Sequence, residues 1–205
     1  MNCGSWSLPT SKCKVGSKLK NNPKSVCSKC YASRMEKFRS KTEKSYSDNY
    51  DKYILSPKKN WIDCMLYLID NSCKKLKTSY FRWFVGGDLQ DSDMLFRIIE
   101  IANNRPKINF WMPTKESNLI MRNYINIPQN LCIRISAPLI NPNSIKIYPS
   151  NINTCTTYDK KSLYIYGFEC PSTQRDKIKR KESTCKACNF KCWDKSVNNI
   201  TYLLH

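Results

Sequence analysis

The chain has 205 residues, and its 35 lysines and arginines against 16 aspartates and glutamates give a formal net charge of +19 at pH 7. Hydrophobic residues make up 40% of the chain and aromatic residues 12%, so most of it is expected to fold rather than remain disordered. A chain of this length is of one-domain size. The single histidine is the terminal His205, which excludes Ser-His-Asp and Cys-His catalysis and histidine-rich zinc sites.

Apolar periodicity predicts helices that alternate with short strands. In chain order, the expected elements are a weak strand at SWSLP, helices over 31–45 and 59–76, a strand Tyr80–Val85, a helix capped by Ser92 and halted before Pro106, a strand Ile108–Met112, a helix cap at Thr114, and strands Leu131–Ala137, Asn153–Tyr158 and Leu163–Phe168. Strands separated by helices pair in parallel through right-handed crossovers. This pattern predicts an α/β fold, a partial (βα) barrel that binds ligands at the carboxyl ends of its strands.

Composition divides the chain at residue 168. Residues 1–30 and 169–192 are rich in cysteine and lysine, whereas residues 31–168 carry the alternating helix and strand patterns. We expect residues 1–168 to form the partial barrel together with an amino-terminal cysteine loop. Residues 169–205 are then a carboxyl-terminal extension with four cysteines.

Seven of the twelve cysteines fall in two groups. Since no segment has the apolar length of a signal peptide or a membrane span, we expect a cytoplasmic protein, in which clustered cysteines are metal ligands rather than disulfides. The first group is Cys13, Cys27 and Cys30, and the second is Cys170, Cys185, Cys188 and Cys192. Four thiolates close a metal site, whereas three leave one iron of a [4Fe-4S] cluster open to a further ligand.

Zinc is the alternative at both groups. The carboxyl-terminal four cysteines could form a structural zinc site, and the amino-terminal three would need Cys3 as a fourth ligand. The remaining cysteines, Cys64, Cys73, Cys132 and Cys155, lie in predicted helices or strands and are expected to be small buried apolar residues.

Two of the five glycines, Gly86 and Gly87, stand together at the end of a predicted strand and precede Asp88. Adjacent glycines allow the backbone to approach a ligand closely, and the carboxylate can accept hydrogen bonds from an ammonium group. The alternative is an ordinary turn from a strand to a helix.

Blocks of sequence along nearly the whole chain resemble a phage family named gene product 88. These blocks are CSKCYA, FRWFVGGDLQDSDML, FWMPTK, RISAP and the final cysteine array ending in CW. Their order is also similar to that of small radical S-adenosylmethionine (SAM) enzymes. That resemblance implies a [4Fe-4S] cluster on Cys13, Cys27 and Cys30, SAM bound by Gly86, Gly87 and Asp88 with Arg134 and Ser136, and an auxiliary cluster on the last four cysteines.

Positive charge concentrates in both cysteine loops. The first loop carries Lys12, Lys14, Lys18, Lys20 and Lys24, and the second carries Arg175, Lys177, Lys179, Arg180 and Lys181. Such a surface favours nucleic acid through counterion release, with Tyr31, Phe190 and Trp193 available for stacking. The alternative is a solvated lysine-rich surface without a partner.

These observations predict an iron–sulfur protein of phage or viral origin, located in the host cytoplasm. It would hold one or two [4Fe-4S] clusters and SAM, receive electrons from a donor, and perform radical chemistry on a nucleic acid or nucleotide without contact with a membrane. One alternative is a non-enzymatic nucleic-acid-binding protein with structural iron–sulfur or zinc sites. Another is a cluster protein that only transfers electrons.

Overall fold

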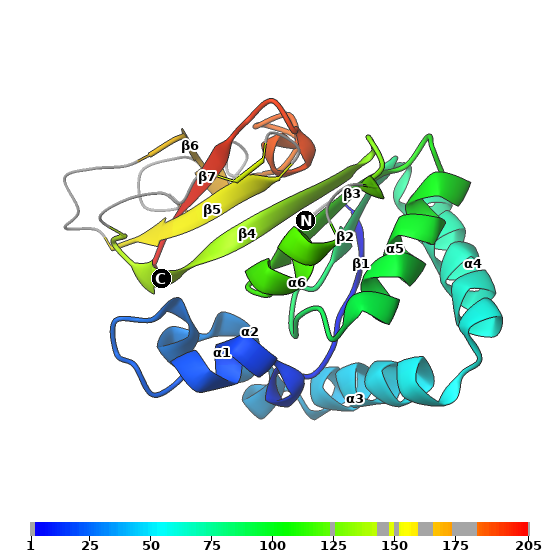
Figure 1. Cartoon of the computed structure of the whole chain (residues 1–205), viewed down its shortest axis with the longest axis horizontal. Helices are drawn as coiled ribbons and strands as arrows, with labels where there is room; N and C mark the ends of the chain where they lie inside the picture. The colour runs from blue at the N-terminus through cyan, green and yellow to red at the C-terminus, as the bar shows by residue number, and fades with distance from the viewer. Residues whose placement is uncertain are drawn as a thin grey trace.

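The computed structural model describes residues 3–123, 126–142, 148–149, 152–159, 166–173 and 184–204. Seven strands form one open parallel sheet in the order β1-β2-β3-β4-β5-β7-β6 (Figure 1). Their bounds are β1 Gly4–Trp6, β2 Tyr80–Trp83, β3 Asn109–Thr114, β4 Leu131–Ile140, β5 Asn153–Tyr158, β6 Phe168–Glu169 and β7 Asn199–Leu203. The predicted α/β class and parallel pairing are confirmed, and the sheet is not closed.

Six α-helices lie in the described part of the chain. They are α1 Lys14–Leu19, α2 Tyr31–Phe38, α3 Ser40–Leu55, α4 Lys58–Leu76, α5 Ser92–Asn104 and α6 Ser117–Arg122, with short 3-10 turns η1 Thr10–Lys12, η2 Val26–Lys29, η4 Pro171–Thr173 and η5 Lys191–Trp193. Within these residues, no helix is long and apolar enough to cross a membrane.

Several predicted boundaries shift for local reasons. The helix expected over 31–45 is two helices, because Arg39 leaves the helical conformation at φ −135° and ψ 88°. The cap of α5 is Asp91 rather than Ser92, since the Asp91 carboxylate accepts a hydrogen bond from the Met94 amide at 2.8 Å. Thr114 ends β3 instead of capping a helix, although its hydroxyl accepts a bond from the Glu116 amide at 3.0 Å. Of the predicted strand Leu163–Phe168, residues 163–165 lie outside the described residues.

Alternation along the strands gives the sheet two faces with different coverings. In β4, Leu131, Ile133 and Ile135 join the main apolar core with the buried sides of α4 and α5. Cys132 and Arg134 alternate with these residues and therefore point to the opposite face. The carboxyl-terminal segment covers that second face, where Trp193 and Cys192 pack in a separate cluster.

Arg134 fastens that segment to the sheet. Its side chain is fully buried, and its five N–H donors all bond to backbone carbonyls. The carbonyls belong to Thr154 (3.3 Å), Lys191 (3.1 Å), Cys192 (2.8 Å), Asp194 (2.8 Å) and Val197 (2.8 Å). The carboxyl-terminal segment forms no regular strand pairing with β4, and these hydrogen bonds from Arg134 hold it against the sheet.

We expect Arg134→Met to lower the free energy of unfolding by more than about 3 kcal/mol, because it leaves several buried carbonyls without a donor. Urea denaturation measures this change. The free energy of unfolding of Arg134→Lys should lie between those of the parent and of Arg134→Met, because lysine keeps some of the N–H donors. The control is Arg105→Met, which breaks a largely exposed pair with Asp70 and should cost less than about 1 kcal/mol. Equal losses in the Arg134 and Arg105 variants would contradict this role.

Candidate metal centre

The first cysteine loop lies against the carboxyl ends of the central strands, with α1 and α2 below β4 and β5 in Figure 1. Parallel pairing brings the carboxyl ends of all these strands to one edge of the sheet. Hydrogen bonds hold the loop at this edge. Near α1, Lys14 Nζ donates to the Gln90 carbonyl and the Val15 amide donates to Glu116 Oε1 at 3.0 Å. Near η2, Ser25 Oγ donates to the Pro138 carbonyl at 3.0 Å, and the Lys24 carbonyl accepts a bond from the Ile140 amide at 2.8 Å.

The loop forms a cavity of about 270 Å³ that is lined by Cys13, Cys27 and Cys30 together. Its other lining residues are Pro9, Thr10, Ser11, Gly16, Ser17, Lys20, Ser33, Glu36, Lys37, Glu43 and Ser47. This volume is close to the lower end of cofactor and ligand pockets, roughly 300 Å³. The three cysteines that the sequence grouped therefore share one cavity.

Each of the three cysteines lies at the start of a helical turn. Cys13 is the N-cap of α1, and Cys30 is the N-cap of α2, where its sulfur accepts a hydrogen bond from the Ser33 amide at 3.5 Å. Cys27 lies in η2, and its amide donates to Ser25 Oγ at 3.1 Å. Amide groups at helix starts carry partial positive charge, which favours an anionic group in the cavity.

Gly16 leaves open the space between two of these sulfurs. A Cβ added at Gly16 would lie 3.5 Å from Cys27 Sγ and 3.8 Å from Cys13 Sγ, and 3.1 Å from Cys13 Cβ. Gly16 lies inside α1, where glycine is an unfavourable helix residue. Its value at this position is therefore the space that it leaves beside the thiols.

The surroundings of Cys13 and Cys27 raise the pKa of both thiols. Burial raises the pKa of Cys13, and the Asp88 carboxylate and the Cys30 and Cys27 thiols raise it further. Burial also raises the pKa of Cys27, although the Lys115 ammonium opposes this shift. A cation or cluster that binds here must therefore displace protons.

No three histidine, cysteine or carboxylate side chains within the described residues are arranged to share one metal ion. The three cavity cysteines are no exception. The cavity thus brings the three thiols together without arranging them around a single ion.

The Gly86-Gly87 turn follows β2, and its bare glycine faces are covered by protein. A Cβ at Gly86 would lie 2.7 Å from the Tyr46 ring, and one at Gly87, where φ is +75°, would lie 2.5 Å from Leu8 Cβ. These close approaches explain both glycines by packing and backbone conformation. The turn brings the β1 and β2 loops together, since the Leu8 amide donates to the Gly86 carbonyl at 3.0 Å.

Asp88 is a buried carboxylate at the same edge. Its Oδ1 accepts bonds from Thr114 Oγ1 (2.6 Å) and the Leu89 amide (2.8 Å), and its Oδ2 accepts one from the Lys115 amide (3.0 Å). Burial raises the pKa of Asp88 to about 6, against the opposing effect of these hydrogen bonds. A carboxylate offers about four acceptor positions, so one position on Oδ2 remains.

The other two residues assigned to SAM, Arg134 and Ser136, form hydrogen bonds within the protein. All five N–H donors of Arg134 bond to backbone carbonyls, so none remains for a ribose. The Ser136 hydroxyl lies 3.1 Å from Cys155 Sγ, with which it shares a hydrogen bond.

The second cysteine group gathers on the opposite face of the sheet and includes Cys3. Cys3, Cys170 and Cys192 are buried in one cluster, and Cys185 packs against it. Burial raises the pKa of Cys3 to about 11, and the Cys185 thiol raises it further. A hydrogen bond from the Cys192 thiol lowers the pKa of Cys170 to about 6. Cys188 is half-buried, and its thiol donates to the Cys185 carbonyl at 3.4 Å.

Cys3 is therefore not a fourth ligand of the first group, as a zinc site there would require. The sequence offered no signal for its true position, because Cys3 is far from the carboxyl-terminal cysteines along the chain. Cys73, Cys132 and Cys155 are buried as expected, but Cys64 is exposed because it lies on the outer face of α4.

The model of a protein family described as Gene product 88 matches residues 7–195 of the chain. No curated protein and no solved structure matches it.

The shifted pKa of Asp88 predicts a pH dependence of stability. The folded protein keeps a proton on Asp88 up to pH about 6, whereas the unfolded chain loses it near 3.8. Stability is therefore lost as pH rises through this window, by up to roughly 3 kcal/mol. Urea denaturation of the metal-free protein between pH 4 and pH 7 should show this loss, and Asp88→Asn should remove it. Asp70→Asn, in an exposed ion pair, is the control, and an equal pH slope in all three proteins would contradict the prediction.

Proposed function

The chain belongs to the gene product 88 family of phage proteins, whose name states no activity, and from its cysteine cavity we propose that it is an iron–sulfur protein of radical SAM type. Cys13, Cys27 and Cys30 hold a [4Fe-4S] cluster, and the open iron takes SAM. The observation that carries the proposal is the single cavity shared by three cysteines at the carboxyl edge of a parallel sheet.

The donor set and the surroundings support a cluster. Thiolates are the usual ligands of iron–sulfur clusters, and helix starts at Cys13 and Cys30 favour the negative charge of a thiolate-ligated cluster. Gly16 keeps the space between two sulfurs free of side-chain atoms.

When bound, a cluster on Cys13, Cys27 and Cys30 would supply an electron for the reductive cleavage of SAM. The chain's own contribution is to position SAM. We assign Asp88 to its ammonium group, because this carboxylate lies near enough to Cys13 to raise the pKa of that thiol and its Oδ2 keeps an acceptor position. Lys115, which follows β3, donates from Nζ to the Ala137 carbonyl at 2.9 Å and so joins the ends of β3 and β4 beside this site.

The cluster is tested by anaerobic reconstitution with iron and sulfide in a background that carries Cys3→Ala, Cys185→Ala and Cys188→Ala. That background leaves only Cys170 and Cys192 in the second group, too few thiolates to hold a cluster, so counted iron belongs to the first group. We expect Gly16→Ala to reduce bound iron at least about twofold, since its methyl group occupies cluster space, while stability of the metal-free protein changes by less than about 1 kcal/mol because alanine favours the helix.

Lys18→Ala on the same helix is the matched control and should leave iron content unchanged, because Lys18 is exposed to solvent. Parent protein should show a spin-resonance signal that changes on addition of SAM, and reduction should release 5′-deoxyadenosine. Protein that folds and binds no iron in this background contradicts the cluster. Protein that binds iron but shows no response to SAM contradicts the radical chemistry and leaves electron transfer or a structural role.

For the second group we propose a closed metal site on Cys170, Cys185, Cys188 and Cys192, holding an auxiliary [4Fe-4S] cluster or zinc. Burial of Cys3 among these cysteines supports its inclusion as a further ligand or as a neighbouring hydrogen-bond donor. Such a site would join the amino terminus and the carboxyl-terminal segment across one face of the sheet.

If Cys3 is a ligand, Cys3→Ser should lower metal bound by the second group in protein that carries Cys13→Ala, Cys27→Ala and Cys30→Ala. Cys73→Ser is the control, because Cys73 is buried in the other core. Elemental analysis for iron and zinc also decides between the two metals. Unchanged metal content in the Cys3 variant would restrict the site to the four carboxyl-terminal cysteines.

A further inference from the structure

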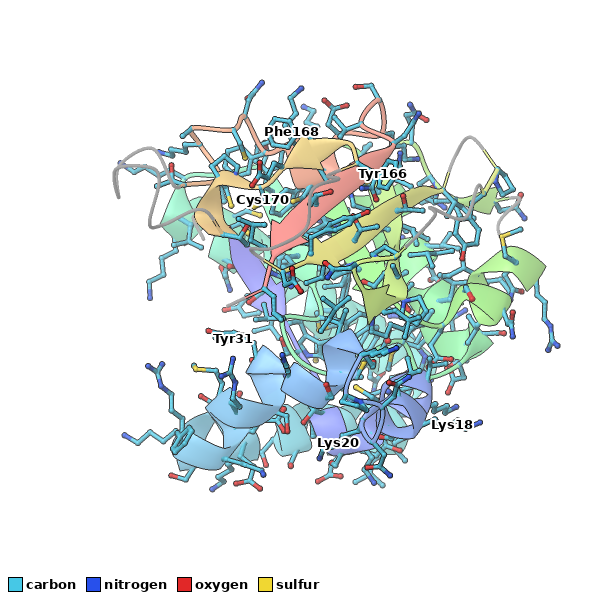
Figure 2. All side chains as sticks on the ribbon, turned by 90° about the vertical axis from the view of Figure 1, so that its left-hand side faces the viewer. Lys18, Lys20, Tyr31, Tyr166, Phe168 and Cys170 are labelled. Carbon is cyan, nitrogen blue, oxygen red and sulfur yellow. The ribbon has the colours of Figure 1, made fainter. Side chains whose placement is uncertain are left out.

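Positive charge is densest around the cysteine cavity. Residues 12–44 contain eleven lysines and arginines against two glutamates, so this sixth of the chain carries +9 of the net +19. Two of these cations, Lys20 and Lys37, line the cavity itself. Figure 2 shows Lys18, Lys20 and Tyr31 on the helices of this amino-terminal part.

No lysine or arginine of residues 12–44 forms an ion pair with a carboxylate among the described residues, and Glu36 and Glu43 are the acidic residues that line the cavity. Glu36 is buried, and it accepts bonds from the Thr10 amide (3.0 Å) and the Thr10 hydroxyl (2.7 Å). The ion pairs found among the described residues lie on other segments, on α4, on α5 and in the carboxyl-terminal segment. The basic surface is therefore available to an anionic partner.

Helix α2 adds two exposed aromatic rings to this surface. Tyr31, Arg34 and Phe38 stand at positions i, i+3 and i+7, which places them along one side of the helix, while Ala32 and Glu36 are buried. The side chain of Tyr31 is 59% exposed and that of Phe38 is 85% exposed. Tyr31 directly follows Cys30, so this aromatic stripe begins at the cavity.

From this placement we propose that single-stranded nucleic acid binds along α1 and α2 and is the substrate class of the cysteine cavity. Phosphates contact Lys18, Lys20 and Lys37, and unpaired bases stack on Tyr31 and Phe38 on either side of Arg34. The assignment of a substrate rests on the proposed function, whereas the binding surface does not.

The choice of a single strand over other anions follows from the aromatic stripe. Paired bases in a duplex do not offer their faces to a side chain, and an acidic peptide has no ring systems to stack. A membrane-surface helix needs a continuous apolar side, but α2 separates its two exposed rings with Arg34.

The test is fluorescence anisotropy with a labelled oligothymidine of about 16 nucleotides, the upper end of site sizes for small binding folds. Measurements use both metal-free and reconstituted protein at several salt concentrations. We expect Tyr31→Ala and Phe38→Ala each to weaken binding about fivefold to a hundredfold, with the salt dependence unchanged. The triple variant Lys18→Gln, Lys20→Gln and Lys37→Gln should reduce the log–log salt slope by about 2, at roughly 0.7 per phosphate contact on a single strand.

Two controls match these variants. Tyr67→Ala removes another exposed ring, which is 69% exposed on α4. Lys74→Gln, Lys75→Gln and Lys77→Gln together remove the same charge from the exposed carboxyl end of α4. Both control proteins should bind as the parent does, apart from a small effect of net charge.

Failure to bind the oligonucleotide, or equal effects of test and control variants, overturns the proposal. So does tighter binding to duplex DNA, or binding to anionic phospholipid vesicles that the same α2 variants abolish. Iron content is measured in parallel, so the two proposals fail separately. If the protein binds the single strand but holds no cluster, the proposed binding surface stands and only the proposed chemistry is contradicted. Reconstituted protein that responds to SAM without binding the strand contradicts only the substrate.

Discussion

Parallel strand pairing is the constraint on which the candidate site depends. Because β1 to β4 run in the same direction, the segments that follow them emerge at one edge of the sheet. The first cysteine loop follows β1, the Gly86-Gly87-Asp88 turn follows β2, and Lys115 follows β3. The edge is fastened by hydrogen bonds from this loop to residues after β2, β3 and late in β4. The three cysteines of the first loop thus share a cavity near Asp88, a buried carboxylate that is far from them in the sequence.

The opposite face of the sheet shows how a chain with little regular structure is fixed in place. Residues 191–197 form one 3-10 turn and no strand, yet their backbone carbonyls accept four of the five hydrogen bonds of the fully buried Arg134, and the fifth goes to the Thr154 carbonyl in β5. Asn153 adds bonds from its amide nitrogen to the Lys195 carbonyl (2.9 Å) and the Val197 carbonyl (3.2 Å). The guanidinium charge also lies beside Cys132, Cys155 and Cys192 and lowers the cost of a thiolate there. One buried side chain therefore supports both the fold and the second cysteine group.

The cavity inside the first cysteine loop and the surface outside it differ in charge and in exposure to solvent. Inside the cavity, burial and the Asp88 carboxylate keep Cys13 protonated. Outside it, exposed lysines and the stripe of Tyr31, Arg34 and Phe38 face solvent with no carboxylate partners among the described residues. The loop thus combines a site suited to an electron-rich cluster with a surface suited to a polyanion. This combination is what joins the proposed chemistry to the proposed substrate.

Local patterns were enough to predict the α/β class, the parallel pairing, the apolar stripe of α4 and the grouping of Cys13, Cys27 and Cys30, because periodicity and short cysteine spacings are local signals. The same patterns missed β7, which is short and lies after the last predicted element, and they placed the α5 cap one residue late. The position of Cys3, the reason for glycine at positions 86 and 87, and the role of Arg134 on the second face became clear only from the folded chain. Each of these depends on contacts between residues far apart in the chain, such as Leu8 against Gly87, and no local pattern encodes a neighbour of that kind.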